Sequence, residues 1–208
     1  MIDAKVFFDK VAAYNVSIFP MQIITMIIAI ILTYLLFVSG STIINKLMKA
    51  YLFLTFLWLT FMFPFEGVFK VVFGLILIAI AILFLLDMFA GKIELKFSEI
   101  GTKKYIILFL IFSSFVLYPI IQYMSGHSYP NILLFGVAPC PTIIFSIALL
   151  IGAMPKVDKK IFIVLIFAAI FSGVTAPIML GVWADLLLLF SGIYGLIILI
   201  KDWKLVGK

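Results

Sequence analysis

The chain has 208 residues, which is enough for one domain or at most two. Hydrophobic residues make up 66% of it, charged residues only 12%, and the mean hydropathy is +1.37. A soluble domain is about half apolar and about a quarter charged, so a soluble fold could not bury this much Ile, Leu and Phe. The composition therefore excludes an ordinary soluble protein and predicts an integral membrane protein whose remaining apolar surface is covered by lipid.

The net charge of +6 comes entirely from lysine, because the chain contains no arginine. These lysines lie in short clusters between apolar runs rather than along one basic face. A nucleic-acid-binding protein concentrates its basic residues in a patch or a stripe. We therefore expect a lipid bilayer as the partner, and no nucleic acid.

The first residues of the chain form an amphipathic segment, Asp3–Tyr14. Val6, Phe7 and Val11 fall on one helical face of this segment, and Asp9 falls elsewhere. Such a pattern is typical of a helix that lies in the membrane interface. We expect a short helix over residues 3–14, on the membrane surface before the first span.

Seven apolar runs follow. A bilayer core about 30 Å thick needs about 20 helical residues, and backbone groups must be paired in hydrocarbon, so these runs must be helices. Asp185 is the expected N-cap of the last one. We predict one all-α transmembrane domain over residues 1–208, a bundle of about seven transmembrane helices with spans at about 18–39, 47–63, 68–89, 104–124, 141–154, 161–180 and 184–200.

The lysines also predict the orientation. With seven spans, twelve lysines share a side with the C-terminal tail, and three lie on the other side. Lysine-rich loops stay in the cytoplasm, so we expect the N-terminus outside and the C-terminus in the cytoplasm. Asp87, near the inner end of the third run and beside Lys92, is interpreted as an interface carboxylate paired with a lysine.

Helix-breaking and polar residues gather toward the outer side. Seven of the eight prolines lie in the outer third or beyond it, together with the polar residues Gln22, Thr25, Thr60, Gln122, Thr142, Ser172, Thr175 and Asp185. Proline frees a backbone carbonyl, which is tolerated in a membrane only where protein or a wet cavity satisfies it. Two interpretations are open: ordinary packing near the interface, or an outward-open polar pocket that reaches into the membrane.

The only cysteine, Cys140, and the only histidine, His127, both fall on this outer side. Pro141 suits the first turn of a helix, which puts Cys140 at a helix N-terminus, where backbone amides and the helix dipole favour a thiolate. The two side chains could form a thiolate–imidazolium pair or serve as two ligands of a soft metal ion. The third interpretation is a small buried cysteine and a loop histidine.

Two motifs in this region resemble those of an uncharacterised family of small prokaryotic seven-span membrane proteins, a domain of unknown function. They are Gly126-His127-Ser128-Tyr129-Pro130 and Pro139-Cys140-Pro141-Thr142, with Phe135-Gly136 between them. Asn15, Gln22 and Asp185 also match family positions, whereas Ile143 stands where the family has a second threonine. The resemblance implies a multi-pass protein of a prokaryotic cell membrane, and it implies no activity.

The sequence thus predicts a site that faces the outside of the cell and that contains His127, Tyr129, Cys140, Thr142, Asp185, Gln22 and Asn15. Its expected role is to bind, and in one version to transport, a small solute or a soft metal ion held by His127 and Cys140. Two alternatives stay open. One is a noncatalytic subunit of a larger membrane complex or homo-oligomer, and the other is a membrane-embedded thiol enzyme with Cys140 as nucleophile and His127 as base. Recognised catalytic motifs are absent, so a binding protein is favoured over an enzyme, and no cofactor is indicated.

Overall fold

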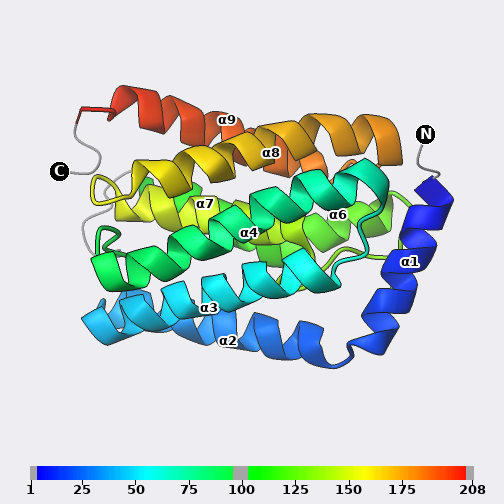
Figure 1. Cartoon of the computed structure of the whole chain (residues 1–208), viewed down its shortest axis with the longest axis horizontal. Coiled ribbons are helices and arrows are strands. Elements are labelled where there is room, and N and C mark those ends of the chain that lie inside the picture. Colours follow the sequence, from blue (N-terminus) through cyan, green and yellow to red (C-terminus); the bar gives the residue numbers. More distant parts are fainter. Residues whose placement is uncertain (1–3, 96–102, 205–208) are drawn as a thin grey trace.

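The computed structural model describes residues 4–95 and 103–204, and the regular structure in these two ranges is helical throughout. The helices run roughly along one axis, except that α1 lies across one end of the bundle (Figure 1). In chain order they are α1 (Ala4–Ser17), α2 (Met21–Val38), α3 (Thr42–Met62), α4 (Gly67–Ala90), α5 (Lys103–Phe112), the π-helical segment η1 (Ser113–Leu117), α6 (Tyr118–Met124), α7 (Pro139–Ala153), α8 (Lys159–Leu180) and α9 (Asp185–Lys201).

The two ends of the bundle differ in composition. At one end, which we call the α1 end, lie α1, the α3–α4 connection, the segment between α6 and α7, and the α8–α9 turn (Figure 1). At the opposite end, which we call the lysine-rich end, lysines pair with acidic or aromatic side chains of neighbouring elements. These lysines are Lys49, Lys92, Lys103, Lys156 and Lys159.

Side chains and glycines at the helix ends explain several boundaries. The Ser41 hydroxyl accepts the Ile44 amide at 3.3 Å and so caps α3, and the Asp158 carboxylate accepts the Lys160 amide at 2.8 Å and caps α8. Gly91 and Gly181 end α4 and α8 in the left-handed conformation, with φ of 65° and 69°. Glycine adopts this conformation without a Cβ penalty.

The starts of α3, α7 and α9 differ from the predictions. α3 begins at Thr42, well before residue 47, because Ser41 provides a cap in a stretch whose lysines interrupt the apolar pattern. α7 begins at Pro139 rather than Pro141. The prediction that Asp185 is the N-cap of the last helix is wrong: Ala184 is the N-cap, and the Asp185 carboxylate is engaged with side chains of other helices.

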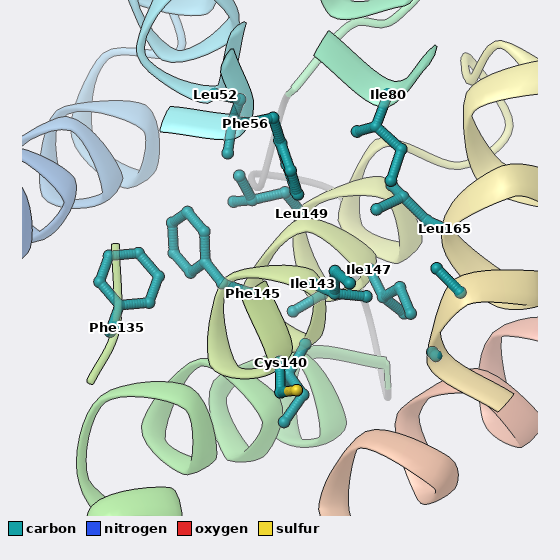
Figure 2. Close-up of a cluster of buried hydrophobic side chains, with 14 of the residues drawn as sticks. Leu52, Phe56, Ile80, Phe135, Cys140, Ile143, Phe145, Ile147, Leu149 and Leu165 are labelled. Carbon is teal, nitrogen blue, oxygen red and sulfur yellow. The ribbon is translucent and has the colours of Figure 1, made fainter. Parts of the chain in front are cut away.

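α7 is the central helix of the bundle. All of its residues, from Pro139 to Ala153, are buried, and it packs against α3, α5, η1, α8 and α9. Figure 2 shows Phe145 and Ile147 of α7 directed toward side chains of neighbouring elements such as Phe135 and Leu165. The surroundings of α7 are therefore protein rather than lipid.

Among the described residues, five helices are long and apolar enough to cross a membrane: α2, α3, α4, the continuous α5–η1–α6 segment and α8. α7 is apolar but shorter. Large apolar side chains also face outward from the bundle, and on α2 they include Ile23, Ile27 and Ile30. A surface of this kind needs lipid around it, so the chain has the architecture of a membrane protein.

The α5–η1–α6 segment is a single span that contains a wide turn. The amide of Tyr118 bonds the carbonyl of Ser113, five residues earlier, which defines the π-helical turn η1. Pro119 follows directly. Its ring cannot donate a backbone hydrogen bond and would crowd the carbonyl four residues earlier in a regular α-helix. The wider turn relieves this conflict and changes the direction in which Tyr118 points.

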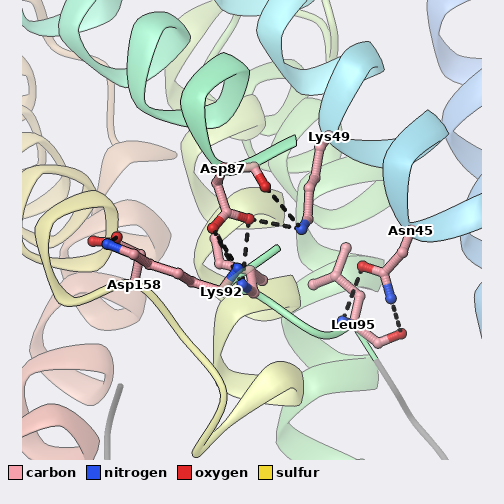
Figure 3. Close-up of polar contacts among 7 residues, drawn as sticks. Asn45, Lys49, Asp87, Lys92, Leu95 and Asp158 are labelled. Atoms are coloured by element: carbon pink, nitrogen blue, oxygen red, sulfur yellow. Dashed lines mark hydrogen bonds and ion pairs between the residues drawn. The ribbon is translucent and has the colours of Figure 1, made fainter. Parts of the chain in front are cut away.

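At the lysine-rich end, a buried ion pair joins α3 to α4. The ammonium of Lys49 lies 2.7 Å from the carboxylate of Asp87, and both side chains are almost fully buried. The same carboxylate accepts the backbone amides of Lys92 and Ile93 (Figure 3). The interpretation of Asp87 as a carboxylate paired with a lysine is therefore confirmed, with Lys49 as its partner, while the ammonium of the neighbouring Lys92 reaches Asp158.

Candidate functional site

The α1 end contains a cavity of about 70 Å³ between several helices. The cavity therefore has room for more than a single water molecule. Its wall combines α1, the α3–α4 connection, α4, the segment before α7, the start of α7, the second half of α8, the α8–α9 turn and the start of α9. The lining residues are Phe7, Lys10, Phe63, Pro64, Phe65, Glu66, Phe69, Phe73, Leu133, Pro139, Cys140, Ser172, Thr175, Ala176, Met179, Leu180, Val182 and Asp185.

A fully buried carboxyl group, that of Asp185, forms part of this wall. The Tyr118 hydroxyl donates to its Oδ1 at 2.5 Å, and the Cys140 thiol donates to its Oδ2 at 3.4 Å. The three residues come from α6, α7 and α9, so three helices converge on one carboxyl group. Each carboxylate oxygen has two lone pairs, and both therefore keep capacity for a further donor.

Five phenylalanines form an aromatic part of the lining. Phe65 stacks in parallel on Phe73 with ring centroids 5.0 Å apart, and it contacts Phe63 at 4.6 Å. Phe7 of α1 reaches Phe63 at 6.4 Å. These rings come from three different elements, so the cavity wall joins phenylalanine rings in different orientations to the Asp185 carboxyl group.

An ion pair between Lys10 of α1 and Glu66 before α4 lies on another part of the wall. Both side chains are more than two-fifths exposed to solvent, whereas Asp185 is fully buried. The ion pair therefore marks the solvent side of the cavity, and the carboxyl group marks its inner side. Cys140 keeps 9% of its surface exposed.

Of the residues predicted from the sequence, Cys140 and Asp185 are brought together in this cavity. Thr142 follows Cys140 by two residues in α7, but its hydroxyl serves the backbone: it donates to the Ala138 carbonyl at 2.7 Å and accepts from the Gly136 amide at 3.1 Å. Gly136 has a φ of 78°, which a side chain would strain. Thr142 and Gly136 thus shape the entry into α7.

The remaining predicted residues lie in a second cluster, which holds α1 against the segment before α7. Asn15 donates to the carbonyls of Pro130 and Ile132, both at 2.7 Å. Gln22 donates to the carbonyl of Asn15 at 2.6 Å. Tyr129 is about half exposed. These amide side chains fix the position of α1, which carries Phe7 and Lys10 to the cavity.

His127 belongs to this second cluster. Its ring stacks on Phe8 of α1, with centroids 3.8 Å apart and an angle of 19° between the planes. Partial burial lowers the pKa of His127 below its usual 6.5. The place beside the Cys140 sulfur, which the sequence suggested for His127, is taken by the Asp185 carboxyl group.

The donor set for a metal ion is small. Within residues 4–95 and 103–204, no three or more His, Cys, Asp or Glu side chains gather closely enough to hold a metal ion. The cavity offers one thiol and two carboxyl groups: the Cys140 thiol donates to Asp185, and Glu66 is paired with Lys10. A closed structural zinc site takes four ligands, so these residues do not form one.

Sequence reasoning missed Tyr118 and the aromatic side chains of the cavity. Tyr118 does carry a signal, because a buried tyrosine hydroxyl in an apolar run needs a hydrogen-bond partner, and Pro119 beside it marks an irregular turn. The phenylalanines carry no such signal. They are common throughout this chain, and only the fold selects those that line the cavity.

Comparison of the sequence with models of known families identifies the family of the chain. A family model matches residues 4–207, a range that includes α1 to α9 and every residue of the cavity wall. Neither a curated protein nor a solved structure matches the chain. The chain belongs to the family of unknown function DUF6064.

Proposed function

We propose that the protein is a seven-span protein of a prokaryotic cell membrane and that its α1-end cavity, open to the outer side, binds a small solute. In this arrangement the N-terminus lies outside and the C-terminus in the cytoplasm. The solute enters past Lys10 and Glu66 and reaches the Asp185 carboxyl group. Binding does not require a covalent step.

The seven spans are α2, α3, α4, α5–η1–α6, α7, α8 and α9. Five of them are long enough to cross a bilayer, and α7 is shorter but enclosed by other helices, so it need not match the thickness of the surrounding lipid. The twelve-to-three distribution of lysines favours the lysine-rich end as the cytoplasmic one. The cavity at the opposite end then faces outward.

The observation that carries the binding proposal is the buried Asp185 carboxyl group in the wall of a cavity that five phenylalanines also line. Ligand sites in proteins are mostly apolar and contain a few well-placed polar groups that orient the ligand. Tyr118 and Cys140 hold this carboxyl group from two other helices. A group fixed in this way is pre-organised to orient a ligand.

The same geometry argues against the thiol-enzyme alternative. A thiol nucleophile needs a base, or a cationic neighbour that favours its thiolate. The neighbour of Cys140 is a carboxyl group, whose negative charge would repel a thiolate. Cys140 is better understood as a hydrogen-bond donor to Asp185 and as part of the cavity wall.

Because Cys140 is the only cysteine, it reports on the cavity without any engineering. Purified protein is treated with methyl methanethiosulfonate, a small thiol reagent, and the rate of Cys140 modification is followed by mass spectrometry. The measurement is repeated with a panel of small amines, alcohols and carboxylic acids. We expect members of at least one class to protect Cys140 in a saturable manner.

A cavity-filling variant provides the matched control. Ala176→Phe places a ring in the cavity wall and should slow the modification of Cys140 strongly. Val174→Phe adds the same ring on an exposed face of α8 and should leave the rate unchanged. The proposal would be overturned if Cys140 were modified at the same rate in both variants and if no solute changed that rate.

A further inference from the structure

The positive and negative charges around the cavity do not cancel when Asp185 is ionised. Lys10 and Glu66 pair with each other, so their charges cancel. The Asp185 carboxyl group, in contrast, receives its hydrogen bonds from Tyr118 and Cys140, which are both neutral donors. Across the described lining residues, an ionised Asp185 therefore leaves one negative charge without a cationic partner.

Such a carboxylate favours a cation as ligand. Burial of an anion in an apolar environment is costly unless a charge of opposite sign lies beside it. Attraction between the two charges is also stronger there than in water, because the local dielectric constant is low. A ligand that carries its own positive charge would supply the missing partner, whereas an anionic ligand would be repelled.

The aromatic part of the wall favours the same class of ligand. The faces of Phe, Tyr and Trp rings attract cations within about 6 Å of the ring centroid, and aromatic cages recognise quaternary ammonium groups in this way. Phe65 and Phe73 stack with their planes 7° apart, and Phe63 packs against Phe65 at 58°. The cavity thus joins aromatic rings in different orientations to the Asp185 carboxyl group.

The size of the cavity limits the ligand. A volume of about 70 Å³ favours a compact ligand, such as a trimethylammonium group with a short substituent, over a nucleotide or a large cofactor.

We propose that the solute is a small organic cation, a quaternary or protonated amine, whose ammonium group lies between Asp185 and the phenylalanine rings of the cavity. This inference rests on the proposed function and assigns its ligand class. The ammonium group belongs either to a free amine or to the headgroup of a lipid, because the recognising chemistry is the same for both.

Two isosteric probes test the charge. Choline carries a quaternary nitrogen, and 3,3-dimethylbutan-1-ol replaces that nitrogen with carbon at nearly the same shape. Each is titrated against the modification of Cys140 by methyl methanethiosulfonate. We expect choline to protect Cys140 at a concentration about tenfold or more below that of the alcohol, because the cation gains both the carboxylate and the ring faces.

Substitutions test whether Asp185 causes the preference for choline over the alcohol. For each variant, protection is measured as the ratio of the Cys140 modification rates with and without solute. In the unsubstituted protein choline should protect at a lower concentration than the alcohol, and Asp185→Asn should reduce this difference in concentration about tenfold. The exposed Asp9 provides the matched control, and Asp9→Asn should leave this difference unchanged. Should Asp185→Asn fail to fold, Phe65→Leu tests the same site, because it removes one ring and keeps the carboxyl group.

An experiment in nanodiscs distinguishes a free amine from a lipid headgroup as the source of the ammonium group. The protein is placed in nanodiscs of phosphatidylglycerol alone, or of phosphatidylglycerol mixed with phosphatidylethanolamine, without a free amine. Protection of Cys140 in the mixed nanodiscs supports a lipid headgroup, and protection by choline in the phosphatidylglycerol nanodiscs supports a free amine.

Equal protection by choline and the alcohol, or protection by the alcohol alone, would overturn the cation inference and leave the binding proposal standing. If the whole solute panel, choline included, fails to protect Cys140, the proposed function itself fails. The two failures are therefore distinguishable by experiment.

Discussion

The buried ion pair at the lysine-rich end makes a sharp prediction about stability. Lys49 and Asp87 lie 2.7 Å apart, with side chains only 3% and 2% exposed. Lys49→Met leaves the Asp87 charge buried without its cation, and Asp87→Asn leaves the Lys49 charge buried without its anion. Each single substitution should cost about 3–5 kcal/mol of unfolding free energy, as the removal of one partner of a buried pair does.

The double variant should be much less damaged than the sum of the two singles. Asn at position 87 can still accept the amides of Lys92 and Ile93, which Asp87 accepts now, and neither buried charge remains. The residual cost is that of imperfectly satisfied buried amide donors, about 1–3 kcal/mol. The free energies are measured by reversible unfolding in mixed micelles with increasing dodecyl sulfate. A double variant whose cost equals the sum of the singles would refute the reasoning, because it would show that the two charges do not interact.

Two further predictions concern packing and pH. A Cβ on Gly173 would lie 2.6 Å from the Leu189 backbone nitrogen, so Gly173→Ala should destabilise the α8–α9 contact by about 1–3 kcal/mol. A Cβ on Gly74 meets open space, so Gly74→Ala should be neutral or stabilising by up to about 1 kcal/mol. Thermal unfolding of both variants measures the two effects. Equal changes in stability for Gly173→Ala and Gly74→Ala would contradict the close packing of α8 on α9. The pKa of His127 is lowered in the folded state, so the unfolded chain binds a proton more readily, and stability should decline as the pH falls below the usual 6.5. His127→Phe keeps a ring on Phe8 and should remove that decline without slowing Cys140 modification, whereas a slower reaction would support a His–Cys pair.

The helices could be predicted because apolar runs of the right length leave the backbone no alternative in lipid. Their ends could not all be predicted. α3 begins at Thr42 because the Ser41 hydroxyl caps it, although Lys46 and Lys49 interrupt the apolar pattern there. The π turn before Tyr118 is a response to Pro119, and its effect on side-chain direction depends on three-dimensional geometry.

The site could be predicted only in part. Helix-terminal placement and an unusual motif drew attention to Cys140, and an isolated acid in an apolar stretch drew attention to Asp185. Their contact could not be derived, because it joins residues 45 positions apart in the sequence. His127 seemed the natural partner since it is the only histidine, but a position on the same side of a membrane does not fix a contact. Its ring stacks on Phe8 instead.

The most direct test of an outward-facing cavity is the modification of Cys140 from one side of the membrane. Spheroplasts and inside-out vesicles are each treated with 2-(trimethylammonio)ethyl methanethiosulfonate, a permanently charged reagent that does not cross lipid. Methyl methanethiosulfonate, which crosses lipid, confirms that Cys140 can react in both preparations. We predict modification by the charged reagent in spheroplasts and none in inside-out vesicles. Modification in the inside-out vesicles alone, or in neither preparation before the protein is unfolded, would contradict an outward-facing cavity at Cys140 and Asp185.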